Sequence, residues 1–318
     1  MSSSSEFGRI GVVGAGGVGG FYGIMLARAG LDVHFLLRGD YAAVAANGLT
    51  LHSKQLGDTV LHPVAAYRDV AQMPPCDWLL VATKATDNAA LAQTLARAAA
   101  PGARVVLLQN GLGAEDSLRH ALPDSVNLLG CLCIVSAHRV APGVIEHHDY
   151  HSVTLGYHSG PGPAPGVLAQ GAALFEAGGI TASLADDLLR ARWQKLVMNV
   201  PFNGLSVLLG SGTRDLMAHP RTRALIRELM EEVCAGAAAC GHALPDGYID
   251  QAWRATDGKP DYTPSMLLDF TARRPLELEA IYAAPLAAAA AAGQPMRKVE
   301  MLYQTLCFLD ARNRGMAR

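Results

Sequence analysis

The sequence is poor in lysine and nearly balanced in charge. Of its 26 basic residues only five are lysines, and the formal net charge is -2. The arginines are scattered along the chain, so no basic stripe is available to follow a phosphate backbone, and no nucleic-acid partner is expected. No stretch approaches the roughly 18 consecutive apolar residues of a membrane span, and the N-terminus lacks the basic and apolar regions of a signal peptide. We therefore expect a cytoplasmic protein that does not bind a membrane.

The sequence also lacks the cysteine and histidine spacings of common metal sites. Its six cysteines form no C-x-x-C pair, and we expect them to be reduced thiols. His147, His148 and His151 lie beside Glu146 and Asp149, but the spacing is not H-E-x-x-H. Adjacent histidines on a strand point to opposite faces, so this cluster predicts a sheet edge or turn and no metal.

Half of the 318 residues are apolar, which is enough for two domains with separate cores. In the first half, short apolar runs alternate with helical patterns, which indicates a parallel α/β sheet. The expected strands are 10–13, 33–37, 78–82, 105–108 and 128–135, with two more, 143–148 and 152–156, flanking a turn. After residue 186 only helical patterns follow, at 187–209, 218–241, 246–256, 275–292 and 297–313.

The run Gly14-Ala15-Gly16-Gly17-Val18-Gly19 stands between the first strand pattern and a helical one. This order aims helix N-terminal amides at a pyrophosphate, which can approach closely because glycine has no side chain. The alternative is a tight turn without a ligand, but the strand and the spacing favour a dinucleotide. We expect a Rossmann-type, doubly wound domain over residues 1–185, a helical substrate and dimerisation domain over 186–318, and an active site in the cleft between them.

Three further residues follow strands of the first domain. Arg38 stands where an NAD site usually carries Asp or Glu, and an arginine suits a 2′-phosphate, which favours NADP. Lys84 and Asn110 end their strands at the carboxyl edge, where open α/β sheets bind ligands. The plainer alternatives are a solvated strand end for Arg38 and a simple Asn-Gly turn at Asn110.

A polar stripe runs along one predicted helix of the second domain. Lys195, Asn199 and Asn203 recur at four-residue spacing and share an arc of about 80° in an otherwise apolar segment. The stripe could simply face solvent. Two observations favour a site: lysine is rare in this chain, and its surface stripes use Arg and Glu instead.

At this point the chain resembles the ketopantoate reductase (2-dehydropantoate 2-reductase) family over nearly its whole length. The matching segments occur in order: the glycine turn with Leu-Leu-Arg38, Ala82-Thr-Lys84-Ala, Leu108-Gln-Asn110-Gly-Leu-Gly, Trp193-Gln-Lys195-Leu-Val-Met-Asn199-Val-Pro-Phe-Asn203, Ser265-Met-Leu-Leu-Asp269 and Arg274-Pro-Leu-Glu277.

The resemblance implies roles for the polar residues of the second domain. It makes Lys195 the general acid, Glu277 the active-site carboxylate, and Asn199, Asn203 and Ser265 substrate ligands. Lys84 and Asn110 would line the nicotinamide end of the site. Glu279 is an alternative to Glu277, and Ser265 could instead cap the following helix.

The chain departs from the family pattern at Pro201, Gly204 and Leu276, which bears more on the substrate than on the reaction. A proline inside the stripe would remove an amide and kink the helix. The expected function is NADPH-dependent reduction of 2-dehydropantoate to pantoate in pantothenate biosynthesis. The alternatives are a related 2-hydroxy acid dehydrogenase with an aromatic or branched substrate and a non-catalytic NADP sensor. The alanine-rich helical domain suggests a homodimer.

Overall fold

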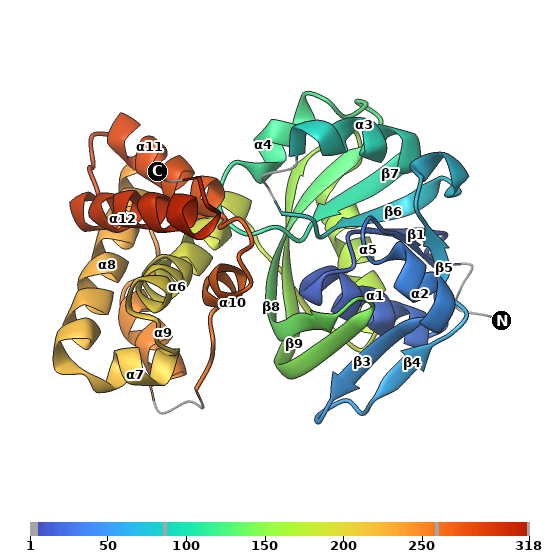
Figure 1. Ribbon diagram of the computed structural model, residues 1–318. Coiled ribbons are helices and arrows are strands. Elements are labelled where there is room, and N and C mark those ends of the chain that lie inside the picture. Colours follow the sequence, from blue (N-terminus) through green and yellow to red (C-terminus); the bar gives the residue numbers. More distant parts are fainter. Residues whose placement is uncertain (1–5, 85–87, 258–260, 317–318) are drawn as a thin grey trace. The chain divides into compact units, whose positions relative to one another are not determined.

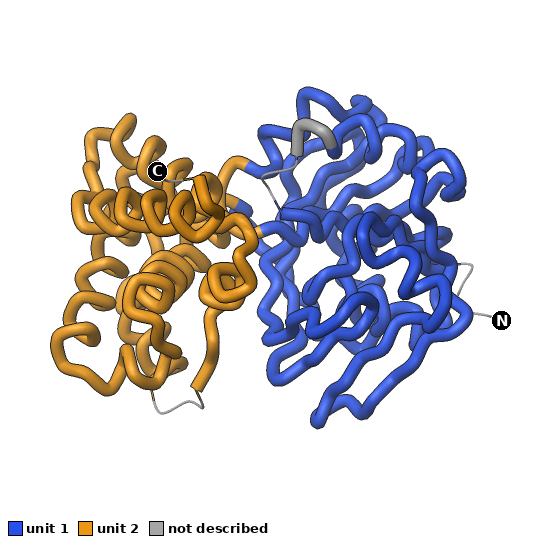
Figure 2. Tube along the Cα trace, viewed as in Figure 1, with its two compact units in different colours: residues 1–109, 114–188 blue, residues 110–113, 189–318 orange. Residues whose placement is uncertain are grey.

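The chain forms two compact units in the computed structural model, which describes residues 6–84, 88–257 and 261–316. Unit 1 comprises residues 1–109 and 114–188, and unit 2 comprises residues 110–113 and 189–318 (Figure 2). The chain therefore contributes a four-residue segment to unit 2 long before the main crossover at residue 189.

Unit 1 is built on a mixed sheet of ten strands (Figure 1). The strand order is β4-β3-β9-β8-β7-β6-β1-β2-β5, and β10 pairs with β9. The strands are β1 (Ile10–Val13), β2 (Val33–Leu36), β3 (Leu49–Ser53), β4 (Thr59–Leu61), β5 (Ala65–Tyr67), β6 (Cys76–Val81), β7 (Ala99–Leu107), β8 (Asn127–Ala141), β9 (Val144–Ser159) and β10 (Thr181–Leu184).

Alternate residues of the central strands face two separate cores. Ile10 and Val12 of β1 belong to a core that also contains Phe21 of α1 and Phe175 of α5. Val13 belongs to the core on the other face, with side chains of α3 and α4. This period of two explains why the strands, covered on both faces, appear as continuous apolar runs. The helices of unit 1 are α1 (Gly17–Arg28), α2 (Tyr41–Asn47), η2 (Val70–Gln72), α3 (Asn88–Ala98), α4 (Ala114–Arg119) and α5 (Ala164–Ala177).

The expected α/β architecture is confirmed, with two corrections to the strands. The sheet is not wholly parallel, because β8 and β9 form a long antiparallel hairpin and β3 pairs antiparallel with β4. Nor is there a turn between residues 148 and 152. The strand β9 runs through this point with register shifts, and Tyr150 adopts a φ of 59°. A β-bulge thus takes the place of the expected turn.

The described residues of unit 2 form helices joined by loops, with no strand, as the sequence predicts. Its helices are α6 (Leu188–Leu209), α7 (Thr213–Ala218), α8 (Pro220–Ala239), α9 (Tyr248–Thr256), α10 (Ser265–Thr271), η4 (Glu279–Ala283), α11 (Ala284–Ala291) and α12 (Arg297–Asn313). They enclose an apolar core. The helix expected over 275–292 begins only at Leu278, just before the π-helical turn η4, and residues 275–277 lie outside any helix. No helix among the described residues has the length and apolarity needed to cross a bilayer.

All six cysteines carry free thiols, and several are buried. Burial raises the pKa of the Cys76 thiol to about 12, and that of Cys234 to about 11, since a thiolate is poorly solvated in an apolar core. The reactive thiolate is therefore scarce at these two positions near neutral pH.

We expect native protein at about pH 8 to react with a thiol reagent at Cys307, which is partly exposed, well before Cys76 or Cys234. Peptide mapping after timed alkylation measures the three rates, and the same reaction in denaturant provides the control in which all sites react. If native Cys76 is labelled as fast as Cys307, the result would contradict the burial of the Cys76 thiol.

Candidate active site

The glycine turn of unit 1 is held by close backbone contacts. Gly14 has a φ of 90°, and its amide donates to the Leu36 carbonyl at 3.2 Å. A Cβ on Gly19 would lie 2.1 Å from the Gly14 carbonyl oxygen, and one on Gly17 would lie 2.5 Å from the Ala137 carbonyl oxygen. Side chains at these positions are therefore sterically excluded, which explains the glycine spacing. The intervening Ala15 is buried, and Val18 packs against the same core.

The N-terminus of α1 fits an anionic ligand. Gly16 is its N-cap, no side chain caps the helix, and the first turn contains no acidic residue. A Cβ on Gly16 would meet nothing within 4 Å. The helix thus offers uncapped amides with open space before them, the arrangement that binds a pyrophosphate.

Arg38 lies exposed just beyond β2, beside the glycine turn in sheet order. Asp40, two residues later, forms an ion pair with Arg139 of β8 at 2.5 Å. Arg139 neutralises the nearby carboxylate, so the three side chains carry a net charge of +1. Sequence reasoning identified Arg38 but missed Arg139, whose contribution depends on the long β8–β9 hairpin.

Lys84 follows β6 at the same carboxyl edge and is half-buried. The adjacent Thr83 lies against the turn, with its methyl carbon 2.9 Å from a Cβ position on Gly14. Gln109, at the end of β7, donates its side-chain amide to the Thr83 carbonyl at 2.9 Å. The Thr83 hydroxyl is buried and has no hydrogen-bond partner among the described residues. Such a hydroxyl is typical of a binding site in which a polar ligand supplies the missing hydrogen bond.

In unit 2 the polar stripe lies on α6. Lys195 and Asn199 are half-buried, whereas Asn203 is only 5% exposed. The Asn203 side-chain oxygen accepts a hydrogen bond from the Met266 amide at 3.3 Å, which ties α6 to the first turn of α10. A fully solvent-facing stripe is thereby excluded. The structure gives Asn203 a positioning contact in addition to the predicted substrate contact.

Ser265 is the first residue of α10, and Pro264 is the N-cap. The N-cap position is thus occupied by the proline and not by the serine, so the structure does not favour the alternative that Ser265 caps the helix. Its side chain is exposed. The cap of α10 comes instead from Asn203, which leaves the Ser265 hydroxyl available for a ligand.

Asn110 and Glu277, 167 residues apart, meet within unit 2. The Asn110 side-chain amide lies 3.5 Å from a Glu277 carboxylate oxygen. Gly111, with a φ of 88°, packs so closely on Ala280 that a Cβ would lie 2.2 Å from the Ala280 carbonyl oxygen. The Asn-Gly pair is therefore more than a plain turn. Of the two candidate carboxylates, Glu277 is half-buried in this contact and Glu279 is exposed.

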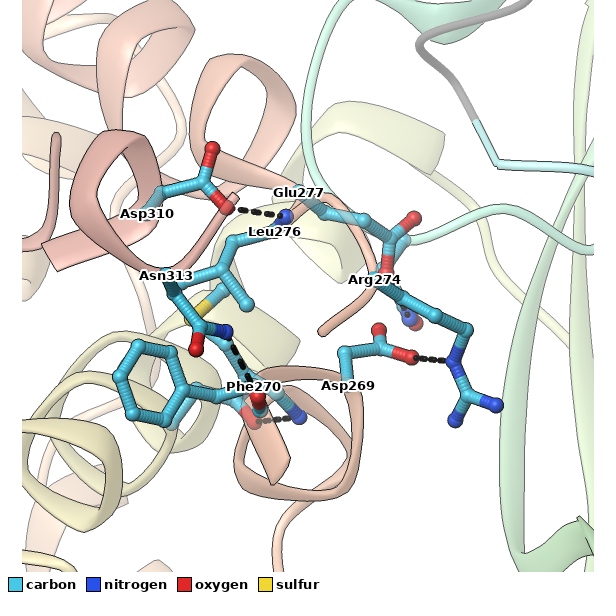
Figure 3. Close-up of polar contacts among 10 residues, drawn as sticks. Asp269, Phe270, Arg274, Leu276, Glu277, Asp310 and Asn313 are labelled. Carbon is cyan, nitrogen blue, oxygen red and sulfur yellow. Dashed lines mark hydrogen bonds and ion pairs between the residues drawn. The ribbon is translucent and has the colours of Figure 1, made fainter. Parts of the chain in front are cut away.

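The non-helical segment before Glu277 is fixed by polar contacts at three points (Figure 3). Asp269 pairs with the Arg274 guanidinium at 2.8 Å. The Leu276 amide donates to Asp310 of α12 at 3.2 Å, and Asn313 donates to the Phe270 carbonyl at 2.7 Å. The last two contacts fasten the end of α10 and the residues that follow it to α12, and so support the chain between Ser265 and Glu277.

Tyr282 is a buried residue that sequence reasoning missed. Its hydroxyl donates to the Val200 carbonyl of α6 at 2.8 Å and lies against Gly204. Burial raises the pKa of this phenol well above its usual value. A Cβ on Gly204 would lie 2.6 Å from the hydroxyl oxygen, so glycine is required there. The neutral hydroxyl thus joins α6, which carries Lys195, to the segment that carries Glu277.

An ammonium, three amides, a hydroxyl and a carboxylate thus occur in one unit. Such a set can bind a polar acid, stabilise a developing alkoxide and transfer a proton. The Asn110–Glu277 contact joins two predicted residues directly, and the Asn203–Met266 contact brings Asn203 to the residue after Ser265. Lys195 and Asn199 lie two turns and one turn before Asn203 on the same helix.

Comparison with known proteins identifies similar chains. Residues 10–160 match the family model described as "Ketopantoate reductase PanE/ApbA", and residues 187–309 match its C-terminal model. The chain is 42% identical over 306 residues to the 2-dehydropantoate 2-reductase of Nostoc sp., covering 95% of both. The crystal structure of 2-dehydropantoate 2-reductase from Geobacter metallireducens superposes with a TM-score of 0.88 at 39% identity, covering 94% of this chain and 98% of that one. A D-mandelate dehydrogenase structure with NADH and anilino(oxo)acetate, at 19% identity and a TM-score of 0.87, shares the fold.

The Tyr282 hydroxyl can be tested without disturbing packing. We expect Tyr282→Phe to lower the free energy of unfolding by about 1–3 kcal/mol, because the buried Val200 carbonyl loses the hydrogen bond that the Tyr282 hydroxyl donates. Urea denaturation provides the measurement. Tyr303→Phe, which removes the hydroxyl of the neighbouring stacked ring, is the matched control and should change stability by less than about 0.5 kcal/mol. Equal effects of the two substitutions would show that the hydrogen bond of the Tyr282 hydroxyl makes no specific contribution to stability.

Proposed function

The chain belongs to the ketopantoate reductase family, and on that basis we propose that it reduces 2-dehydropantoate to pantoate with NADPH, a step in pantothenate biosynthesis. The observation that carries the proposal is the set of residues gathered in unit 2. Lys195, Asn199 and Asn203 share one face of α6. Glu277 contacts Asn110, which lies 167 residues away in the sequence.

The residues proposed to hold the cofactor lie in unit 1, apart from Asn110, which belongs to unit 2. The amides of Gly14 to Gly19 would bind the pyrophosphate, Arg38 the 2′-phosphate, and Lys84 with Asn110 would contact the nicotinamide end. When bound, the reduced nicotinamide supplies a hydride to the oxo carbon of the substrate. The uncapped start of α1 and the charge excess at Arg38, Asp40 and Arg139 support this assignment.

Lys195 is proposed as the proton donor. Reduction of the oxo group places negative charge on its oxygen, and a nearby ammonium both stabilises that charge and protonates it. Lys195 is half-buried on a helix that is anchored by Tyr282, so its position is well defined. Asn199 would direct its amide to the same substrate, and Asn203 to both the substrate and α10.

Glu277 and Ser265 are proposed to position the substrate. The Glu277 carboxylate can accept a hydrogen bond from a substrate hydroxyl while Asn110 orients it. The exposed Ser265 hydroxyl, fixed at the start of α10, can donate to the acid group of the substrate. Both residues depend on the anchored segment between them.

Two of the three departures from the family pattern lie in the protein interior. Pro201 is buried within α6, and Leu276 is 4% exposed in the core of unit 2. A related 2-hydroxy acid dehydrogenase with an aromatic or branched substrate remains the alternative function, and a homodimer remains a prediction.

We expect Lys195→Ala to lower kcat for ketopantoate reduction by about 100- to 10,000-fold, the usual contribution of a positioned acid. Steady-state NADPH oxidation provides the measurement, and cofactor affinity should stay unchanged. Lys298→Ala, which removes an exposed ion pair with Glu228, is the matched control and should retain kcat. A near-wild-type kcat in Lys195→Ala would show that this lysine is not the acid. If the wild-type protein binds the cofactor but turns over no 2-oxo acid, the result would favour the sensor alternative.

Arg38 is expected to set the preference for NADPH. Arg38→Ala should raise KM for NADPH by about ten- to a hundredfold and leave KM for NADH unchanged. This factor corresponds to the loss of one charge-assisted hydrogen bond to the 2′-phosphate. Arg28→Ala, an exposed arginine of α1 that donates to the Leu56 carbonyl, is the control. A parallel rise in both Michaelis constants would mean that Arg38 supports the fold of the site and does not recognise the 2′-phosphate.

A further inference from the structure

Three potential metal ligands converge on one face of the β8–β9 hairpin, and none of them is among the residues assigned to the reaction. His138 of β8 is the register partner of Glu146 of β9, so their side chains project from the same side of the sheet. His148 lies two residues beyond Glu146 and points to that side as well. One ligand atom from each of the three residues lies within 4.8 Å of the others.

The bulge in β9 explains how His148 reaches this group. Ala137 pairs with His147, but the next residue of β8, Ser136, pairs with Asp149, so His148 is an extra residue in the ladder. Such bulges redirect a side chain. The imidazole of His148 stacks on that of His138, with ring centroids 5.1 Å apart and planes at 15°.

The three groups are close enough to share a cation, and the carboxylate makes no hydrogen bond to either ring. Glu146 oxygens lie 3.9 Å from His138 Nε2 and 4.0 Å from His148 Nε2, beyond hydrogen-bond range. His148 Nε2 lies 3.3 Å from the other His138 nitrogen, Nδ1, so the two rings share a long hydrogen bond that a bound ion would replace. Ligand atoms around a tetrahedral Zn²⁺, at bond lengths near 2.0–2.1 Å, are about 3.3 Å apart. Small side-chain rotations would therefore bring all three to bonding distance.

The neighbouring histidines show why the sequence argued against a metal. His147 points to the opposite face, as predicted for adjacent strand residues, and is 2% exposed. Its two ring nitrogens contact the Ser53 hydroxyl and the Tyr150 carbonyl. His147 therefore has no nitrogen to offer. The missing partner of His148 is His138, which only the antiparallel pairing of β8 and β9 supplies.

We propose that His138, Glu146 and His148 form a binding site for one divalent transition-metal ion of the Zn²⁺ type. Two imidazoles and a carboxylate suit Zn²⁺, Co²⁺ or Ni²⁺, whereas Mg²⁺ and Ca²⁺ prefer oxygen ligands. The carboxylate gives the neutral-imidazole site a charge of -1. His148 and Glu146 are about half exposed, so water completes the coordination. The bound ion would cross-link β8 to β9 where the backbone of His138 packs against Gly17 of the glycine turn.

Calorimetric titration of the full-length, tag-free, EDTA-treated protein with Zn²⁺ tests the proposal. We expect one equivalent to bind at micromolar concentration, and His148→Ala or Glu146→Gln to weaken binding at least tenfold. His52→Ala is the matched control and should bind as the wild type does. It removes an exposed histidine that contacts Asp58 directly at 2.8 Å but has no third ligand.

Thermal unfolding gives a second readout, because a ligand that binds only the folded state raises the unfolding temperature. Zn²⁺ should raise it for the wild type and for His52→Ala, but not for His148→Ala, and excess Mg²⁺ should have no such effect. Absence of stoichiometric binding would overturn the proposal. So would equal Zn²⁺ affinity in His148→Ala, which would assign binding to other groups such as the thiols.

Discussion

The carboxyl edge of the parallel strands is the constraint on which the rest of the molecule depends. Strands β1, β2, β6 and β7 all end there, so the glycine turn, Arg38, Lys84 and Gln109 emerge at one edge of a sheet buried on both faces. Hydrogen bonds tie these ends together, including Gly14 to Leu36 and Gln109 to Thr83. The chain then passes directly from Gln109 to Asn110, the first residue of unit 2.

Unit 2 solves a different problem, since it must hold polar side chains in an apolar helical bundle. Burying such groups without partners is costly, and the partners here also fix geometry. Asn203 caps α10, Asp310 accepts a hydrogen bond from the Leu276 amide, and the Tyr282 hydroxyl donates to the Val200 carbonyl of α6. The same hydrogen bonds that satisfy these buried groups therefore set the positions of Ser265, Glu277 and the lysine-bearing helix.

Features with strong local periodicity were predictable from the sequence, and features that depend on distant pairing were not. Strands β1, β2, β6, β7 and β8 and helices α6, α8 and α12 follow from apolar patterns, as does the glycine turn. The strands β3, β4 and β5 are short and only partly buried, so their sequences show no apolar pattern long enough to predict a strand. Residues 110–113 join unit 2 through the contact of Gly111 with Ala280, and Arg139 and His138 acquire partners only through the hairpin register. No local pattern encodes such contacts.

The three departures from the family pattern occur in one packed region. Pro201 removes an amide from the middle of α6, yet the helix continues to Leu209. The Tyr282 hydroxyl donates to the carbonyl of the preceding residue, Val200, and Gly204 leaves room for that hydroxyl. Leu276 fills the adjoining core while its amide bonds to Asp310. Each departure therefore changes how α6 and the Glu277 segment are supported, while Lys195, Asn199 and Glu277 keep the residue types that the chemistry needs.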